Sequence, residues 1–250
     1  AGFISPKLLR SQNALNFAYI LYLKLKDLGV NSVQIESHVK RWLVYSILTG
    51  RYSASPESTI DYDIKQISEK SFDVYLKEKE ESELSEAFWN SSLPRSLDTS
   101  VGSSPYFHVF LASQVKENDL GFLSKDITVG HMIEHRGDVH HLFPKEYLKS
   151  AGLDRSKYNQ IANYVYMQQD INIKVGKQSP QEYFSIIRNQ IKTNQVSISG
   201  ITTENELISN FESHCIPKEI ETMTIDNYFD FLEKRRKLMA LKIKNYYFSL

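Results

Sequence analysis

A cluster of histidines is the part of the sequence with the clearest chemical potential. Four of the seven histidines fall between positions 131 and 141, namely His131, His135, His140 and His141. Imidazole is the side chain that both titrates near neutral pH and binds transition metals. Such a cluster predicts a metal site or an acid–base site, and two sets of residues in this stretch could form one.

The first set combines two adjacent histidines with two asparagines farther along. His140 and His141 lie in a stretch with strand character that ends at Pro144, and Asn163 and Asn172 follow, nine residues apart. Because neighbouring side chains on a strand point to opposite faces, His140 and His141 can serve one centre only at a strand end or a bulge. Asp138 lies two residues before His140, hence on the same face, and is a further candidate ligand or an orienting partner.

This pattern resembles the HNH, or ββα-metal, nuclease motif, in the form found in the C-terminal part of GmrSD-type restriction endonucleases. Similar residues surround it at positions 158–164, 172–177, 180 and 183–184, and also at 48–53. The resemblance therefore covers most of the chain and is strongest between residues 138 and 184.

The resemblance implies a metal-dependent DNA endonuclease that acts in bacterial defence against phage or modified DNA. His141 would take a proton from the attacking water, and Asn163 would brace the loop that carries it. His140 and Asn172, with Asp138 as an additional ligand, would hold a divalent cation that stabilises the leaving oxygen. Mg²⁺ or Mn²⁺ fits this role, and the nitrogen ligand also allows Ni²⁺ or Zn²⁺.

The second set is the segment from His131 to His135, which matches the H-x-x-E-H pattern of inverzincin metallopeptidases. On a helix, His131 and His135 would share one face and could bind zinc, with Glu134 as the general base. A third ligand would have to come from elsewhere in the chain. A different class also stays open, in which the ββα-metal module is inactive and binds DNA or another protein.

Basic side chains indicate where DNA would lie. Lys145, Lys174 and Lys177 are close to the motif in the sequence and could attract phosphates to it. Residues 234–244 carry six basic side chains and no acid, so Arg235 and Arg236 are also predicted to contact DNA. A solvated helix face explains the same run equally well.

Most elements that position the motif are predicted to be helices, from hydrophobic spacing and from start and stop residues. Residues 90–105, rich in serine and proline, are predicted to be a domain boundary or a long loop. The predicted helices are 13–28, 32–50, 56 onward, 72–88, 105 onward, 127–135, 144–151, 155–162, 180–191, 204–214 and 225–248, and the predicted strands are 139–143 and 164–167. This is a mainly α (α+β) fold, with a helical domain at 1–100 and an HNH-type domain at 101–250.

Composition bounds the remaining possibilities. The chain has 250 residues, 30 basic and 30 acidic side chains, and one cysteine, so an intrachain disulfide is excluded. The longest apolar run, residues 17–23, is far shorter than the roughly 20 residues that span a bilayer. We therefore expect a cytoplasmic protein. Zero net charge argues against a protein whose whole surface binds DNA. Members of the family that this sequence resembles carry a further N-terminal domain or subunit, so the resemblance implies such a partner here.

Overall fold

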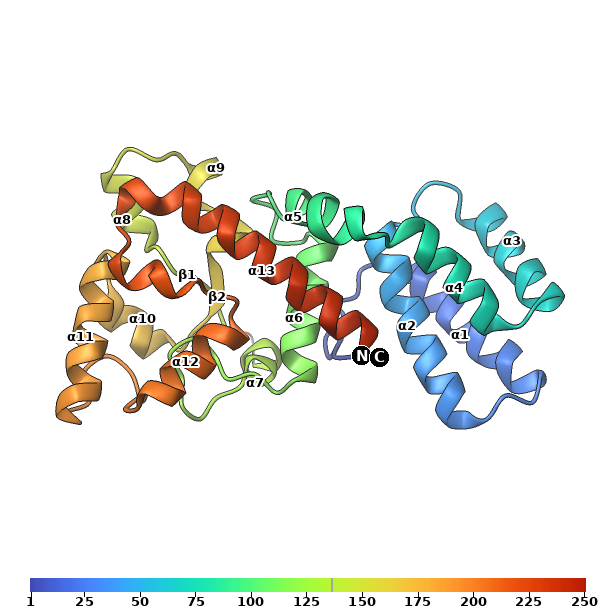
Figure 1. Ribbon diagram of the computed structural model, residues 1–250, viewed down its shortest axis with the longest axis horizontal. Coiled ribbons are helices and arrows are strands. Elements are labelled where there is room, and N and C mark those ends of the chain that lie inside the picture. The colour runs from blue at the N-terminus through green and yellow to red at the C-terminus, as the bar shows by residue number, and fades with distance from the viewer. Residues whose placement is uncertain (136) are drawn as a thin grey trace.

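Helices make up most of the structure, and the described residues form one two-stranded sheet, which lies among the helices of the C-terminal half (Figure 1). The computed structural model describes residues 1–135 and 137–250. The mainly α (α+β) prediction is confirmed. The helices are α1 (Gln12–Asp27), α2 (Ser32–Thr49), α3 (Pro56–Glu69), α4 (Phe72–Glu83), η1 (Phe88–Ser92), α5 (Leu93–Ser96), α6 (Pro105–Lys116), α7 (Val129–Glu134), α8 (Lys145–Ser150), α9 (Arg155–Tyr158), η2 (Ile161–Asn163), α10 (Gln169–Val175), α11 (Pro180–Thr193), α12 (Glu204–Ser213), η3 (Lys218–Thr222), η4 (Ile225–Asn227) and α13 (Tyr228–Phe248), and the strands are β1 (Val139–His141) and β2 (Tyr164–Tyr166).

The first four helices begin within one residue of their predicted starts, and α1 and α2 also end within one residue of their predicted ends. The predicted end of α4 at residue 88 is wrong, because this helix ends at Glu83. The Asn31 side chain accepts a hydrogen bond from the Gln34 amide at the start of α2, and Gly50 ends that helix with a φ of 62°. Glycine adopts this left-handed conformation without the steric cost that a Cβ brings. Helix α2 packs on α1 and also contacts α4 and α6. It therefore joins the N-terminal helical half, which consists of α1–α4, to the rest of the molecule.

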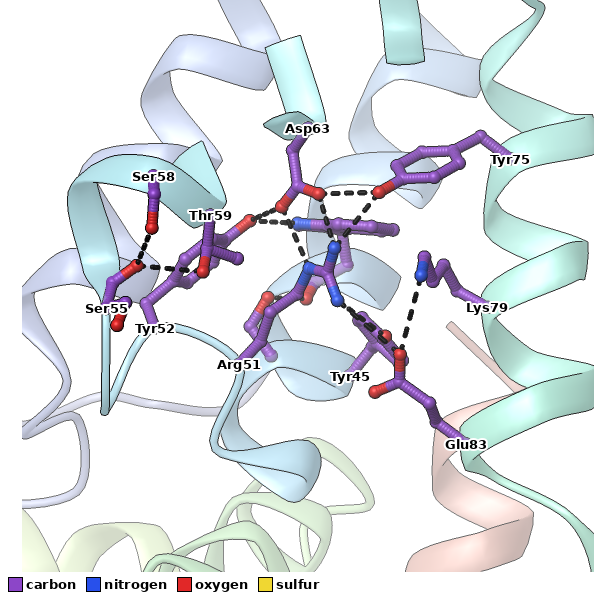
Figure 2. Close-up of polar contacts among 12 residues, drawn as sticks. Tyr45, Arg51, Tyr52, Ser55, Ser58, Thr59, Asp63, Tyr75, Lys79 and Glu83 are labelled. Atoms are coloured by element: carbon purple, nitrogen blue, oxygen red, sulfur yellow. Dashed lines mark hydrogen bonds and ion pairs between the residues drawn. The ribbon is translucent and has the colours of Figure 1, made fainter. Parts of the chain in front are cut away.

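A buried ion pair holds α3 against α2 and α4 (Figure 2). The Asp63 carboxylate is fully buried and accepts hydrogen bonds from the Arg51 guanidinium, from the Tyr52 hydroxyl at 2.7 Å and from the Tyr75 hydroxyl at 2.5 Å. A buried charge is tolerated when its oxygens are satisfied in this way. The stretch 48–53, which the nuclease resemblance included, therefore has a structural role here.

The predicted loop at 90–105 is wrong in its first part. Residues 88–96 form η1 and α5, and Trp89, Leu93 and Leu97 are buried at a spacing of four residues. This stripe packs against α13, the contact that overrides the serine-rich composition. Residues 97–104 lie outside any helix or strand.

Helix α13 connects the two halves of the chain, and in Figure 1 it crosses the molecule from the side of the sheet to α2. It contacts η2, α5, α6 and α2, and the carbonyl of Leu250 beyond its end accepts a hydrogen bond from the Ser37 hydroxyl at 2.8 Å. Buried residues of the predicted domains 1–100 and 101–250 belong to one hydrophobic cluster. No helix in the described residues has the length and apolar character needed to cross a bilayer.

One buried histidine gives the fold a predictable dependence on pH. The His214 ring donates from Nε2 to the Leu120 carbonyl at 2.8 Å, and its Nδ1 lies 3.3 Å from the Gln114 amide nitrogen. Burial lowers the pKa of His214 from 6.5 to about 3. As the pH falls below 6.5, His214 is therefore protonated in the unfolded chain while it stays neutral in the folded chain.

We expect this histidine to remove up to about 1.4 kcal/mol from the free energy of unfolding per pH unit as the pH falls below the unfolded pKa. Urea denaturation between about pH 7 and pH 5 measures the slope, with His214→Gln as the matched variant. Other histidines contribute to both proteins and cancel in the comparison. Equal slopes for the two proteins would contradict the prediction.

Candidate functional site

The two strands pair in antiparallel fashion and carry the adjacent histidines. A long connection that contains α8, α9 and η2 joins them, and the name hairpin refers here to this strand pair. The register pairs Val139 with Tyr166, His140 with Val165 and His141 with Tyr164. His141 and Tyr164 therefore lie on one face of the hairpin, and His140 lies on the other. Helix α10 starts three residues after β2 ends, so the elements run strand, strand, helix.

Asn163 holds the chain just after β1. It is fully buried; its Oδ1 accepts from the Phe143 amide at 2.8 Å, and its Nδ2 donates to the carbonyls of Phe143 at 3.1 Å and Tyr158 at 3.3 Å. The Leu142 amide also donates to the Asn163 carbonyl at 2.9 Å. These bonds fix the backbone that follows His141, which is the contact that the resemblance implies for this asparagine.

The His141 ring is half-buried and has a defined partner. Its Nε2 lies 3.0 Å from Oδ1 of Asn159, and because a carboxamide oxygen only accepts, Nε2 carries the hydrogen. The other nitrogen, Nδ1, then keeps its lone pair. Burial lowers the pKa of His141; the Asn159 bond opposes that change, while the nearby charges of Lys145 and His140 add to it. The ring is thus a neutral base held in one tautomer, and sequence reasoning had assigned Asn159 no role.

The three predicted metal ligands are only partly brought together. Burial lowers the pKa of His140, and the nearby Asp138 carboxylate partly offsets that change. Asn172 lies half-buried on α10, and its side chain makes no hydrogen bond to any described residue. Carboxylate, imidazole and carboxamide donors suit Mn²⁺ or Mg²⁺. No three His, Cys, Asp or Glu side chains converge within residues 1–135 and 137–250, so a cation here would need the Asn172 oxygen, water or substrate to complete its shell.

The predicted DNA-contacting residues divide into two groups. Lys145, Lys174 and Lys177 are exposed, and Lys145 lies near His141 and 5.9 Å from the centre of the Tyr158 ring. The prediction for Arg235 is wrong, because this side chain is fully buried. Arg236 is mostly buried and pairs with Asp98 at 2.7 Å, so its guanidinium is occupied within the fold.

The remaining cations of the run 234–244 are also paired. Each lysine lies within 4 Å of an acid, so the basic run reflects ion pairs on the helix rather than a phosphate-binding stripe. The pairs are Lys234 with Glu219 and Asp230, Lys237 with Glu233, Lys242 with Glu117 and Asp119, and Lys244 with Glu86.

Arg235 instead stabilises the hairpin through hydrogen bonds to its backbone. Its Nη1 donates to the carbonyls of Ala162 at 2.8 Å and Tyr164 at 2.9 Å, which flank Asn163 in the chain. Its Nε and Nη2 donate to the His214 carbonyl at 3.2 and 3.1 Å. No described carboxylate pairs with this cation, so backbone carbonyls alone compensate its charge.

A cavity of about 620 Å³ opens on the His141 face of the hairpin. Tyr164 and Tyr166 line it from β2, and Asp138 lines it near the start of β1. Of the three predicted metal ligands, Asp138 lines this cavity, whereas His140 and Asn172 are not among its described lining residues. Lys7 and Arg10 line it from the other end of the sequence, where no spacing or motif indicated a role in the site.

The alternative peptidase pattern lies on the short helix α7. The rings of His131 and His135 stack with centroids 4.0 Å apart, and Nδ1 of His135 lies 2.9 Å from the His131 carbonyl oxygen. The described residues bring no third His, Cys, Asp or Glu side chain to this pair. The zinc-peptidase interpretation therefore lacks its third ligand in this part of the chain.

Comparisons with known proteins identify a distant relative and no characterised family. No family model matches the chain, and no solved structure matches it. An uncharacterized protein of Methanocaldococcus jannaschii is 26% identical over 221 residues, which cover 82% of this chain and 36% of the relative. The chain thus spans about a third of the length of that curated relative.

Proposed function

We propose that this chain carries a metal-dependent DNA endonuclease site that hydrolyses phosphodiesters. One observation supports this most directly: the neutral His141 ring, whose Nδ1 has no hydrogen bond to a described residue, lines a cavity on a hairpin that Asn163 holds in place. The resemblance to GmrSD-type nucleases supplies the substrate class. It also supplies the setting of bacterial restriction, and the expectation of an additional N-terminal domain or subunit.

The residues of the chain account for most steps of the hydrolysis. Nδ1 of His141 takes the proton of a water whose oxygen attacks phosphorus, and the bond from phosphorus to the 3′ oxygen breaks. The exposed Lys145 ammonium, close to this ring, binds a non-bridging phosphate oxygen. Asn159 and Asn163 react with nothing; they orient the ring and its backbone. A divalent cation held by His140, Asp138 and Asn172 would supply Lewis-acid stabilisation of the leaving oxygen.

A second candidate function is a catalytically inactive module of the same fold that binds DNA or a protein. The observation that favours it is the incomplete ligand set, since no three His, Cys, Asp or Glu side chains converge in the described residues and His140 lies on the opposite face of the strand pair from His141. The two functions differ in one measurable property, the cleavage of DNA.

We expect the purified protein to nick or linearise supercoiled plasmid with Mn²⁺ or Mg²⁺ and to lose this activity in EDTA. Removing the cation removes the charge that stabilises the leaving oxygen, and adding Mn²⁺ in excess should restore cleavage. Agarose gels of the plasmid forms measure it, with binding followed by fluorescence anisotropy of labelled duplex. Tight binding without cleavage at any of the four candidate metals would favour the inactive module, and cleavage that persists in EDTA would contradict the metal requirement.

A further inference from the structure

Two exposed cations line the same cavity as His141. Lys7 and Arg10 lie in the segment before α1, both are exposed, and neither forms an ion pair with an acid in the described residues. Asp138 is the one acid among the described residues that line this cavity, and it lies at the hairpin end. The end formed by the N-terminal segment is therefore positively charged.

The segment that carries these cations is packed against the fold. A Cβ added to Gly2 would lie 2.1 Å from the Ala112 carbonyl oxygen, so the backbone of the segment touches α6. Leu8, between the two cations, is buried in the hydrophobic core. Lys7 and Arg10 thus project from a fixed backbone, which lowers the entropy lost when they bind a ligand.

A second cavity continues from the first toward the helical half. It has a volume of about 500 Å³ and shares Leu8, Arg10, Ser103 and His108 with the cavity of His141. Beyond Arg10 its lining is rich in hydroxyl and amide groups, from Ser11 and Asn13 at the start of α1 to Ser53 after α2. Because the two cavities share one wall, they adjoin, and Arg10 lies where they meet.

We propose that Lys7 and Arg10 bind backbone phosphates of a nucleic-acid strand on one side of the scissile phosphodiester and direct that strand toward the helical half. This inference rests on the proposed nuclease function, which places the scissile phosphate at His141. An arginine fork can bind two oxygens of one phosphate, and a lysine ammonium binds as a point charge. Uncharged polar groups in the second cavity suit a sugar–phosphate backbone, which offers acceptors without sequence information.

The test compares Lys7→Gln/Arg10→Gln with a matched control, Lys26→Gln/Arg95→Gln. The control pair removes the same two charges from exposed positions that form no ion pair with a described acid and line neither cavity. Affinity for fluorescein-labelled duplex is measured in EDTA across a range of salt concentrations. We expect the first variant to bind about tenfold or more weakly at low salt and to lose about 1 from the salt slope for each cation removed.

Neutral phosphate analogues locate the contacts. Single methylphosphonates placed along the strand remove one charge at a time, and we expect wild-type binding to be sensitive at one or two positions on one side of the cleavage point. The Lys7→Gln/Arg10→Gln variant should lose that sensitivity. Equal salt slopes for this variant and its control, or sensitivity spread evenly over both sides, would overturn the inference.

The two proposals fail separately. If His141 variants lose cleavage while Lys7→Gln/Arg10→Gln binds and cleaves like its control, the nuclease site stands and the strand path is wrong. If the protein never cleaves but the salt slope still falls in the Lys7→Gln/Arg10→Gln variant, the cations bind nucleic acid and the nuclease proposal is the one that fails.

Discussion

Replacing His141 with glutamine is expected to lower the rate of DNA cleavage by about 10²–10⁴-fold, the usual contribution of a positioned general base. Glutamine keeps a polar group of similar length beside Asn159, but it has no basic nitrogen to take the proton of the attacking water. DNA affinity in EDTA should stay within about threefold of wild type, because the change removes no fixed positive charge. Single-turnover cleavage of labelled duplex with Mn²⁺ measures the chemical step apart from binding.

Two further variants separate this role from the alternatives. Asn159→Ala removes the partner that holds the hydrogen on Nε2, so cleavage should fall less than in His141→Gln while the fold is kept. His135→Ala changes the exposed ring stack on α7 and should leave cleavage unchanged. If His135→Ala abolished DNA cleavage while His141→Gln spared it, the acid–base assignment to His141 would be wrong, and the pair of His131 and His135 would become the better candidate site.

Short-range signals in the sequence predicted most of the helices on which the candidate site is built. Helix α11 illustrates why: Ser179 and Glu182 form reciprocal hydrogen bonds at its first turn, and Pro180 fits its first position. Such end signals depend on residues within a few positions of each other, so they can be recognised without the tertiary structure. The stretch 90–96 was missed because the fold places Trp89 and Leu93 against α13, a contact far away in the sequence.

The candidate site was predictable only where the resemblance reached. The spacing of His141 and Asn163 resembles a nuclease motif, and the structure shows that His141 is hydrogen-bonded to Asn159 and that Asn163 is hydrogen-bonded to the backbone of Phe143. Nothing in the spacing singled out Asn159 as the ring partner. Arg10 could not have been assigned to the same cavity, since more than a hundred residues separate it from the hairpin and only the packing of the N-terminal segment on α6 brings it there.

The basic run on α13 shows how composition misleads when burial is unknown. Arg235 and Arg236 are neighbours of the same type, and the sequence assigned both to DNA. On a helix, adjacent residues project about 100° apart, so one can enter the core while the next reaches the surface. Arg235 enters the core and bonds to the carbonyls of Ala162, Tyr164 and His214, whereas Arg236 pairs with Asp98.

Replacing Arg235 with methionine is expected to lower the free energy of unfolding by about 3–5 kcal/mol, because it removes the guanidinium donors of two buried carbonyls and one partly buried carbonyl, each loss costing about 1–3 kcal/mol. Methionine fills much of the same volume, so the loss reports the hydrogen bonds more than a cavity. The adjacent Arg236→Met is the matched control, and its partly exposed pair with Asp98 should change stability by about 1 kcal/mol or less. Urea denaturation of both variants measures the difference.

The variants Arg235→Met and Arg236→Met also test whether Arg235 positions the backbone near His141. Because its contacts flank Asn163, loss of the guanidinium should loosen the backbone that follows His141 and lower cleavage even at temperatures where Arg235→Met stays folded. Arg235→Lys should restore little, since one ammonium cannot reach the carbonyls of both the hairpin and His214 as the guanidinium fork does. DNA affinity in EDTA and its salt slope should match those of wild type. If Arg235→Met instead kept wild-type stability and showed a smaller salt slope, Arg235 would be a DNA-contacting residue after all, and the anchor role argued from its burial would be wrong.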